Sequence, residues 1–441
     1  TLRRSSARSV RRISWQPAYS PIFTSAQLWK VRIRLSETQR SPVAAASLST
    51  GLTGVSLILI GSMLPHIVEA FALGEMQTGL LTGAPGFGYL VGVLLAGFLG
   101  DRLGYLHFWR LGGLMGVLAF TGLALAPTFG VALAAAIALG MVPGFFDGSI
   151  NPLFVRLLGD KSAAILNRVH AFFGAGVIGG PLVIAFLMAR GLLWRWIFGL
   201  VAVLAGVVLV AALRVPAPPK QERQPISLWQ VLRAGWFWRG VVASAMYGGL
   251  EVIMLSWTAL YLVKVRGATT ELAALPIALF GAMLLIGRLA SARMVQRIGA
   301  SRLIVAGALV AVLGFGLLVV LPGMIWPWVA VALAGIGLSP ILLTVFADAS
   351  HRAVGLEGAV SSLVSASSGM GKWLLPLAIG SLAHRGRLDI GILLAVPCAL
   401  ILAGAYFSGA LREPAISSPE GEPPRGRCSA SGNKPGNASR F

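Results

Sequence analysis

Long apolar stretches recur along this chain and are separated by short segments rich in Gly, Pro and charged residues. Each stretch holds about 20 residues with few charges, which is the length that an α-helix needs to cross the hydrocarbon core of a bilayer. The pattern therefore predicts an all-α membrane protein with twelve transmembrane helices. The predicted spans are residues 47–68, 78–99, 109–127, 130–157, 163–189, 194–214, 236–262, 272–294, 302–321, 326–346, 357–383 and 389–411.

The longest break between spans is 215–235, "VPAPPKQERQPISLWQVLRAG", which is charged and rich in Pro. It divides the spans into six and six, so we expect two six-helix bundles. We expect a basic, disordered N-terminal tail (1–46), an N-terminal bundle (47–214), a cytoplasmic linker (215–235), a C-terminal bundle (236–411) and a disordered C-terminal tail (412–441).

Composition agrees with a membrane protein. Only 12% of the 441 residues are charged, whereas a soluble domain carries about 25%. The formal charge of +21 would suggest nucleic acid for a soluble protein, but here the basic residues lie mainly in tails and short loops. Their distribution places both termini in the cytoplasm, and we expect a monomer in the plasma membrane. Cys398 and Cys428 form no spacing pattern, so we expect no metal site and no cofactor.

Charged residues inside the spans are the candidate chemistry. Glu251 lies in "AMYGGLEVIMLSWTALYL" and shares a predicted helix face with Tyr247. Lys372 lies near the middle of the eleventh span, "SSLVSASSGMGKWLLPLAIG", at the end of a stripe of serines. Charges that face a shared cavity commonly mark a substrate or proton path. The alternative is that Glu251 and Lys372 form an internal ion pair that holds two helices together.

The N-terminal half carries a second polar set. Asp147 and Asn151 are four residues apart in the fourth span, and Asn167 and His170 are three apart in the fifth, so each pair shares a helix face. Asp147 lies deep in its span, where a carboxylate must face protein or water. We expect these four residues to line a substrate or proton path, although a structural hydrogen bond is an equal alternative for His170.

Short basic turns recur at matching places in the two halves. "GFLGDRLGYLHFWRLG" (97–112) joins the second and third spans, and "GRLASARMVQRIGASRL" (287–303) joins the eighth and ninth. A repeated turn of this kind indicates an internal repeat. The candidate gating residues are Gly97, Asp101, Arg102 and Gly104 in the first turn and Arg288 and Arg293 in the second.

The first turn resembles the loop signature of the major facilitator superfamily, G-x-L-a-D-R-x-G-R/K-R/K. Five of its residues match, but Tyr105 and Leu106 replace the two basic residues at the end. The resemblance covers roughly 47–411 and implies a twelve-helix transporter in which Asp101 braces the cytoplasmic side against the eleventh helix. The polar stretches of the fourth, fifth and seventh spans look like the fucose-permease-like branch of sugar–proton symporters. Gly176, Gly180 and Pro181 also partly match a motif of drug–proton antiporters.

These observations favour secondary active transport of a small polar solute by alternating access, with proton symport of a sugar-like substrate as the specific hypothesis. Alternate protonation of Glu251 or Asp147 would couple proton movement to substrate binding. A drug–proton antiporter of the same fold is the first alternative, and a non-transporting membrane sensor is the second. No G-x-x-x-x-G-K-[ST] or H-E-x-x-H motif occurs, so we expect neither ATP-driven transport nor an enzyme.

Overall fold

The computed structural model describes residues 37–158, 162–216, 228–352 and 357–412, and every element within these ranges is helical. The side chains of a few residues inside helices, including Asp101 and Asn167, lie outside the description. So do most of the predicted tails and the central part of the predicted linker, and the domain limits therefore stay predictions. The first helix begins at Glu37, ahead of the first predicted span.

The helices follow one another with short connections. Their bounds are α2 (Glu37–Ala70), α3 (Glu75–Leu103), α4 (Tyr105–Leu125), α5 (Phe129–Leu158), α6 (Ser162–Ala189), α7 (Trp194–Leu213), α8 (Leu228–Leu232), α9 (Gly235–Val252), the π-helix η2 (Ile253–Trp257), α10 (Thr258–Arg266), α11 (Thr270–Ile298), α12 (Ala300–Val320), α13 (Trp326–Leu338), α14 (Ile341–Arg352), α15 (Glu357–His384), α16 (Leu388–Leu393) and α17 (Ala395–Arg412).

Eleven helical stretches in the described ranges are long and apolar enough to cross a membrane. The remaining predicted span, the eleventh (357–383), corresponds to α15, which has the required length but carries six serines and Lys372. These polar residues lower its mean hydropathy, and α15 instead packs closely against α3 and α9. A polar helix is tolerated at this depth because its polar face meets other helices and not lipid. The prediction of twelve membrane helices is therefore consistent with the structure.

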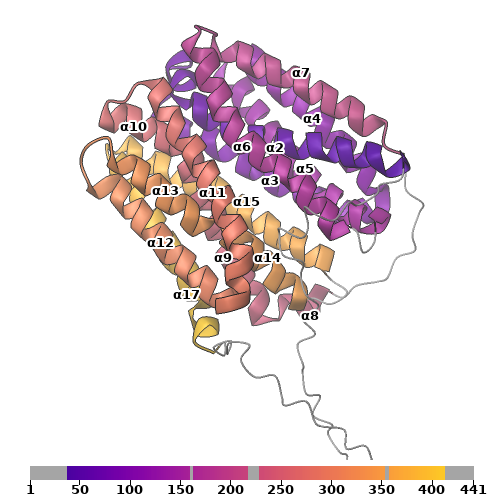
Figure 1. Ribbon diagram of the computed structural model, residues 1–441. Coiled ribbons are helices and arrows are strands. Elements are labelled where there is room, and N and C mark those ends of the chain that lie inside the picture. Colours follow the sequence, from indigo (N-terminus) through magenta and orange to yellow (C-terminus); the bar gives the residue numbers. More distant parts are fainter. Residues whose placement is uncertain (1–36, 159–161, 217–227, 353–356, 413–441) are drawn as a thin grey trace, which may run out of the picture.

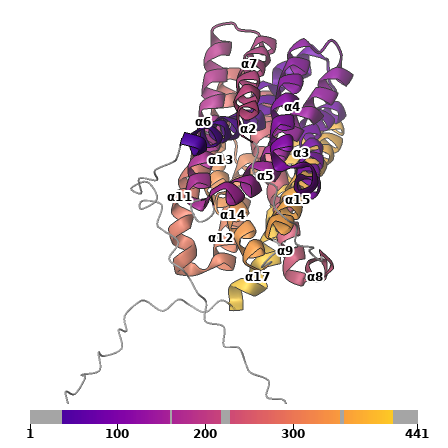
Figure 2. The ribbon, with the colours of Figure 1, turned by 90° about the vertical axis from the view of Figure 1, so that its right-hand side faces the viewer.

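Two groups of helices form the molecule (Figure 1). The first, α2 to α7, is drawn in indigo to magenta, and the second, α9 to α17, in salmon to yellow. The view turned by 90° shows the short α8 and the end of α17 at the same end of the second group (Figure 2). The groups meet where α3 packs against α15 and where α6 packs against α11. These are the two expected six-helix bundles.

Corresponding turns of the two bundles have the same backbone geometry. Gly104 ends α3 and begins α4 with φ +93°, and Gly299 ends α11 and begins α12 with φ +90°. Glycine adopts this conformation without the steric penalty that other residues pay. Arginines in the following helices repeat as well, since Arg110 donates to the carbonyl of Val215 beyond α7 and Arg302 to that of Ala410 in α17. A guanidinium satisfies terminal carbonyls and is favoured near a helix C-terminus. The structure thus supports the internal repeat.

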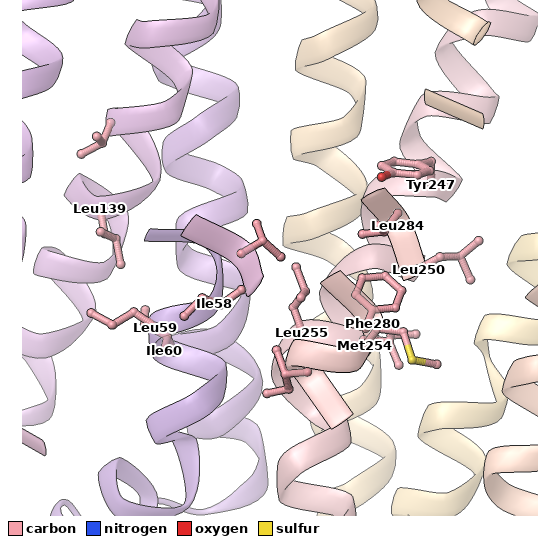
Figure 3. Close-up of a cluster of buried hydrophobic side chains, with 14 of the residues drawn as sticks. Ile58, Leu59, Ile60, Leu139, Tyr247, Leu250, Met254, Leu255, Phe280 and Leu284 are labelled. Atoms are coloured by element: carbon pink, nitrogen blue, oxygen red, sulfur yellow. The ribbon is translucent and has the colours of Figure 1, made fainter. Parts of the chain in front are cut away.

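The bundle interface contains a buried apolar cluster (Figure 3). Ile58 and Leu59 of α2 lie on one side of it, and Leu255 of η2 and Phe280 of α11 lie on the other. Apolar burial alone gives little drive for helix association in lipid, so close packing has to provide it. Gly61 allows that packing, because a Cβ there would overlap the backbone carbonyl of Leu255.

The bundles contact each other on the side of the membrane away from the termini. On the side away from the termini, η2 and α10 pack against α2. There Lys264 Nζ lies 2.5 Å from Glu75 Oε1, which links α10 to the start of α3. On the side of the termini, the described parts of α5 and α14 make at most marginal contact with each other. Packing and an ion pair thus join the two bundles on the side away from the termini.

Candidate functional site

Glu251 and Lys372 form an ion pair between two helices of the C-terminal bundle. Lys372 Nζ of α15 lies 2.8 Å from Glu251 Oε2 of α9, and the two side chains are only 16% and 4% exposed. Tyr247, one turn before Glu251, donates its hydroxyl to Glu251 Oε1 at 2.8 Å. The shared face predicted for Tyr247 and Glu251 is therefore present. Both carboxylate oxygens have a partner, as a buried charge requires.

The face of α9 that carries Tyr247 and Glu251 also includes a polar residue nearer the start of the helix. After Glu251, a π-helix interrupts this face. Ser244 donates to the carbonyl of Val364 in α15 at 2.7 Å, so it too faces the eleventh span. The π-helix η2 then begins at Ile253, and Thr258 donates to the Ile253 carbonyl five residues earlier. A π-turn fits one more residue into the turn, so extrapolation at a constant 100° per residue fails beyond it. Such turns often occur beside functional sites.

Asp147 has a different partner, which belongs to the N-terminal bundle. Tyr89 of α3 donates its hydroxyl to Asp147 Oδ2 of α5 at 3.1 Å. The ring of Tyr89 also lies beneath the Lys372 ammonium, 5.4 Å from nitrogen to ring centroid. A cation at this distance from an aromatic ring is attracted to its face. Tyr89 therefore connects the carboxyl group of one bundle to the ion pair of the other.

Glu251, Lys372, Tyr247, Tyr89 and Asp147 form a polar network, and Arg288 belongs to it. Arg288 does not lie in the turn between α11 and α12, where the sequence motif suggested a gating role. It is ten residues before the end of α11. One of its terminal nitrogens is 3.5 Å from the Tyr247 hydroxyl, and the guanidinium carbon is 5.7 Å from the ring centroid of Phe173 in α6. The reason is helix length, since α11 includes the first part of the motif and ends only at Ile298. Arg288 is thus a second residue that contacts both bundles.

Asn151 and His170 come together as a separate pair. His170 Nε2 of α6 lies 3.2 Å from Asn151 Oδ1 of α5, and the His170 side chain is exposed. Asn151 and Asp147 share no hydrogen-bond partner among the described residues, although the two are one turn apart. Asn167 is part of α6, but its side chain lies outside the described residues. The path proposed for these four residues stays a prediction.

The first predicted gating turn is only partly described. Gly97 allows a close approach of α3 to α15, because a Cβ there would be 2.8 Å from Ser362 Oγ. Arg102 lies exposed in the last turn of α3, and Arg293 is exposed on α11. The predicted brace by Asp101 falls on a side chain outside the description. The structure therefore shows the approach of the second span to the eleventh but does not test the brace.

Sequence reasoning missed Tyr89 and the position of Arg288 in the network. A signal existed for Tyr89, because its hydroxyl is the only side-chain donor in the apolar sequence "GAPGFGYLVG" and a buried carboxyl group needs a donor. For Arg288 the signal was its distance from Gly299, eleven residues or about three helical turns. That depth places a guanidinium within the span.

The assembled network has properties that suit a site whose contacts change. It holds two carboxyl groups and two cations at a bundle interface, within spans where unpaired charges are costly. Two of its contacts, Lys372 with Tyr89 and Arg288 with Phe173, join different bundles. Movement of one bundle against the other would alter these contacts while leaving the Glu251–Lys372 pair intact within its own bundle.

Comparison with known proteins agrees with this architecture. The family model described as Major Facilitator Superfamily matches residues 46–376. An uncharacterized transporter of this type from Yersinia pestis is 24% identical over 347 residues, which is 77% of this chain and 88% of the relative. A bacterial homolog of the human lysosomal transporter Spinster, solved in an inward-facing conformation, has a TM-score of 0.69 and 16% identity over 86% of this chain and 98% of its own. A D-xylose–proton symporter has a TM-score of 0.68 and 17% identity over 84% and 96% of the two chains. The chain therefore belongs to the Major Facilitator Superfamily, and it is a multi-pass membrane transporter by family.

Proposed function

We propose that this protein is a proton-coupled secondary transporter that carries a small, polar, sugar-like solute by alternating access. The observation that carries the proposal is the polar network at the bundle interface, with Tyr89 and Asp147 on one bundle and Lys372 and Glu251 on the other. Ionisable residues inside membrane spans commonly mark substrate and ion paths. Transporters of this architecture work by rocking one bundle against the other around a central site.

The distribution of basic residues supports one orientation of the protein in the membrane. We propose that both termini and the 215–235 segment are cytoplasmic and that the protein is a monomer in the plasma membrane. In that orientation, the packing of η2 and α10 against α2 would close the outer side. The described conformation would then be inward-facing, which is also the state named for the Spinster homolog of similar fold.

The proposals of a sugar-like substrate and of proton coupling have separate support. Polar residues of the fourth, fifth and seventh spans resemble the fucose-permease-like branch, and a D-xylose–proton symporter has the same fold. Counterflow of labelled sugars by purified protein in liposomes tests the proposal directly. Cationic dyes in the same assay test the drug-antiporter alternative, and the absence of counterflow for every solute would favour the sensor alternative.

The two carboxyl groups are expected to differ in their role in coupling. Glu251 is bound to Lys372, whereas the described contact of Asp147 is the Tyr89 hydroxyl. Neutralising Asp147 therefore breaks no ion pair among the described residues. We expect Asp147→Asn to abolish solute accumulation driven by a pH gradient while exchange of solute across the membrane continues, because exchange needs no net proton movement.

The measurement is uphill uptake and counterflow in the same preparation of proteoliposomes. Asp389→Asn is the matched control, because Asp389 is an exposed carboxylate in the first turn of α16, outside the network. It should retain both activities. Uphill uptake at the wild-type rate in Asp147→Asn would remove Asp147 from the coupling mechanism.

The ion pair between Lys264 and Glu75 is expected to favour the conformation closed on the side away from the termini. Because both side chains are partly exposed, at 37% and 23%, the pair should contribute about 0.2–1 kcal/mol and weaken with salt. Glu75→Lys and Lys264→Glu should each shift the protein toward the opposite conformation, and the double exchange should reverse the shift. Distances between spin labels on the loops at Ala72 and Thr269 measure the shift, and identical distances in all variants would contradict it.

A further inference from the structure

Arg288 is the cation of the network that has the fewest partners. Lys372 is neutralised by Glu251 at 2.8 Å, and Asp147 accepts from Tyr89. Among the described residues, Arg288 makes no ion pair within 4.0 Å, its one hydrogen bond reaches the Tyr247 hydroxyl at 3.5 Å, and its buried Nε has no acceptor. A guanidinium has five N–H donors, so most of its capacity is unused.

An underused guanidinium at this depth needs an explanation. Burying a donor without an acceptor costs free energy, and the cost is larger for a charged group. Phe173 supplies a ring face at 5.7 Å, which attracts the cation but accepts no hydrogen bond along the N–H directions. The missing partner is therefore an acceptor, and an anion is the partner that satisfies both the charge and the donors.

The surroundings of Arg288 indicate which anion fits. A guanidinium presents its donors as a planar fork that matches a carboxylate through two parallel hydrogen bonds. On α6, His170 is three residues from Phe173 and thus on the same side of the helix, and it is exposed and bonded to Asn151 of α5. Imidazole and amide groups are suited to hydroxyl groups. A small molecule with a carboxylate and hydroxyl groups would provide partners for Arg288 and for the His170–Asn151 pair.

Resting on the transport function proposed above, we propose that the substrate is a hydroxylated organic carboxylate, such as a sugar acid, whose carboxylate is bound by Arg288. Binding of this group would bring the network a second ion pair, between the substrate and α11. Because Arg288 also lies against Phe173 of the other bundle, the substrate would sit where the two bundles meet. A neutral sugar would leave the guanidinium without its acceptor and bind more weakly.

The test compares solutes that differ only in one group. Purified full-length protein is heated with D-galacturonate or D-galactose, with D-glucuronate or D-glucose, and with further hydroxy acids, each beside a neutral analogue of the same skeleton. We expect the carboxylates to raise the melting temperature and their neutral partners to have little effect. In Arg288→Gln the carboxylates should bind about 10–100-fold more weakly, the loss expected for charge-assisted hydrogen bonds, and Arg288→Lys should lose less because it keeps the charge.

Arg297→Gln is the matched control, because Arg297 is exposed in the last turn of the same helix. It should bind carboxylates as the wild type does, and size-exclusion profiles should show all variants folded. If no carboxylate stabilises the wild type more than its neutral partner, or if Arg288→Gln weakens both equally, the inference is overturned. Counterflow by the wild-type protein separates the two proposals: transport of neutral sugars without transport of their carboxylate analogues would keep the transport function and reject carboxylate recognition, whereas no counterflow of any solute would reject both.

Discussion

Replacing Lys372 with methionine is expected to abolish transport and to destabilise the protein strongly. The substitution removes the cation 2.8 Å from Glu251 and leaves the carboxylate buried, with a side chain only 4% exposed. Removing one partner of a buried ion pair typically costs about 3–5 kcal/mol, because the remaining charge loses its compensation. It also removes the cation above the Tyr89 ring and so one link between the bundles.

Thermal unfolding and counterflow together separate the structural and functional parts of this effect. The double variant Glu251→Gln/Lys372→Met removes both charges, and Gln keeps an acceptor for the Tyr247 hydroxyl. Since neutral replacement of a whole buried pair is often tolerated, the double variant should recover most of the melting temperature. It should not recover transport if the pair acts in the mechanism. Full recovery of transport would show that the pair only holds α9 and α15 together, which is the structural interpretation drawn from the sequence.

Replacing Gly61 with valine is expected to block transport by preventing closure of the bundles. A Cβ at Gly61 would overlap the Leu255 carbonyl in η2, and that atom belongs to backbone and cannot rotate away. Overpacking in a tight contact costs at least about 1–3 kcal/mol, which corresponds to a change of about 5–150-fold in the population of the closed state. The effect acts on one conformation, because the contact between α2 and η2 joins the two bundles.

Spin labels at Ala72 and Thr269, in a background with serine at Cys398 and Cys428, report this closure. The label distance should lengthen in Gly61→Val, and counterflow should fall accordingly. Gly206→Val in α7 is the matched control, since nothing lies within 4 Å of a Cβ at that position. It should have wild-type distances and rates. Wild-type transport and an unchanged distance in Gly61→Val would show that the α2–η2 contact does not limit the cycle.

The periodicity of the chain predicted most of the architecture because each membrane helix satisfies its own backbone hydrogen bonds. Length and apolar content therefore suffice to locate a span such as α12, where the prediction 302–321 compares with Ala300–Val320. The turns at Gly104 and Gly299 could also be predicted, because a turn depends on neighbouring residues. Helical geometry correctly predicted that Tyr247 and Glu251 share one face of α9. The prediction holds only as far as η2, where the number of residues per turn changes.

Hydrogen-bond partners on different helices could not be predicted in this way. The sequence placed Asp147 beside Asn151 on one face, yet Asp147 bonds to Tyr89 of α3, and Asn151 bonds to His170 of α6. Arg288 looked like a residue of a basic turn and proved to be part of the polar network. Which donor meets which acceptor depends on helix rotation and spacing, which are set by close contacts such as that of Gly61 with the backbone of η2.

The sequence by itself determined that twelve helices cross the membrane, that they repeat as six and six, and that charges are buried within them. Tertiary structure alone decided that Glu251 is paired with Lys372, that Asp147 accepts a hydrogen bond from Tyr89, and that Arg288 Nε has no acceptor among the described residues. The physical reason is the range of the interactions. Helix formation and membrane insertion depend on neighbouring residues, whereas the pairing of buried charges depends on residues far apart in the chain that only packing brings within hydrogen-bond distance.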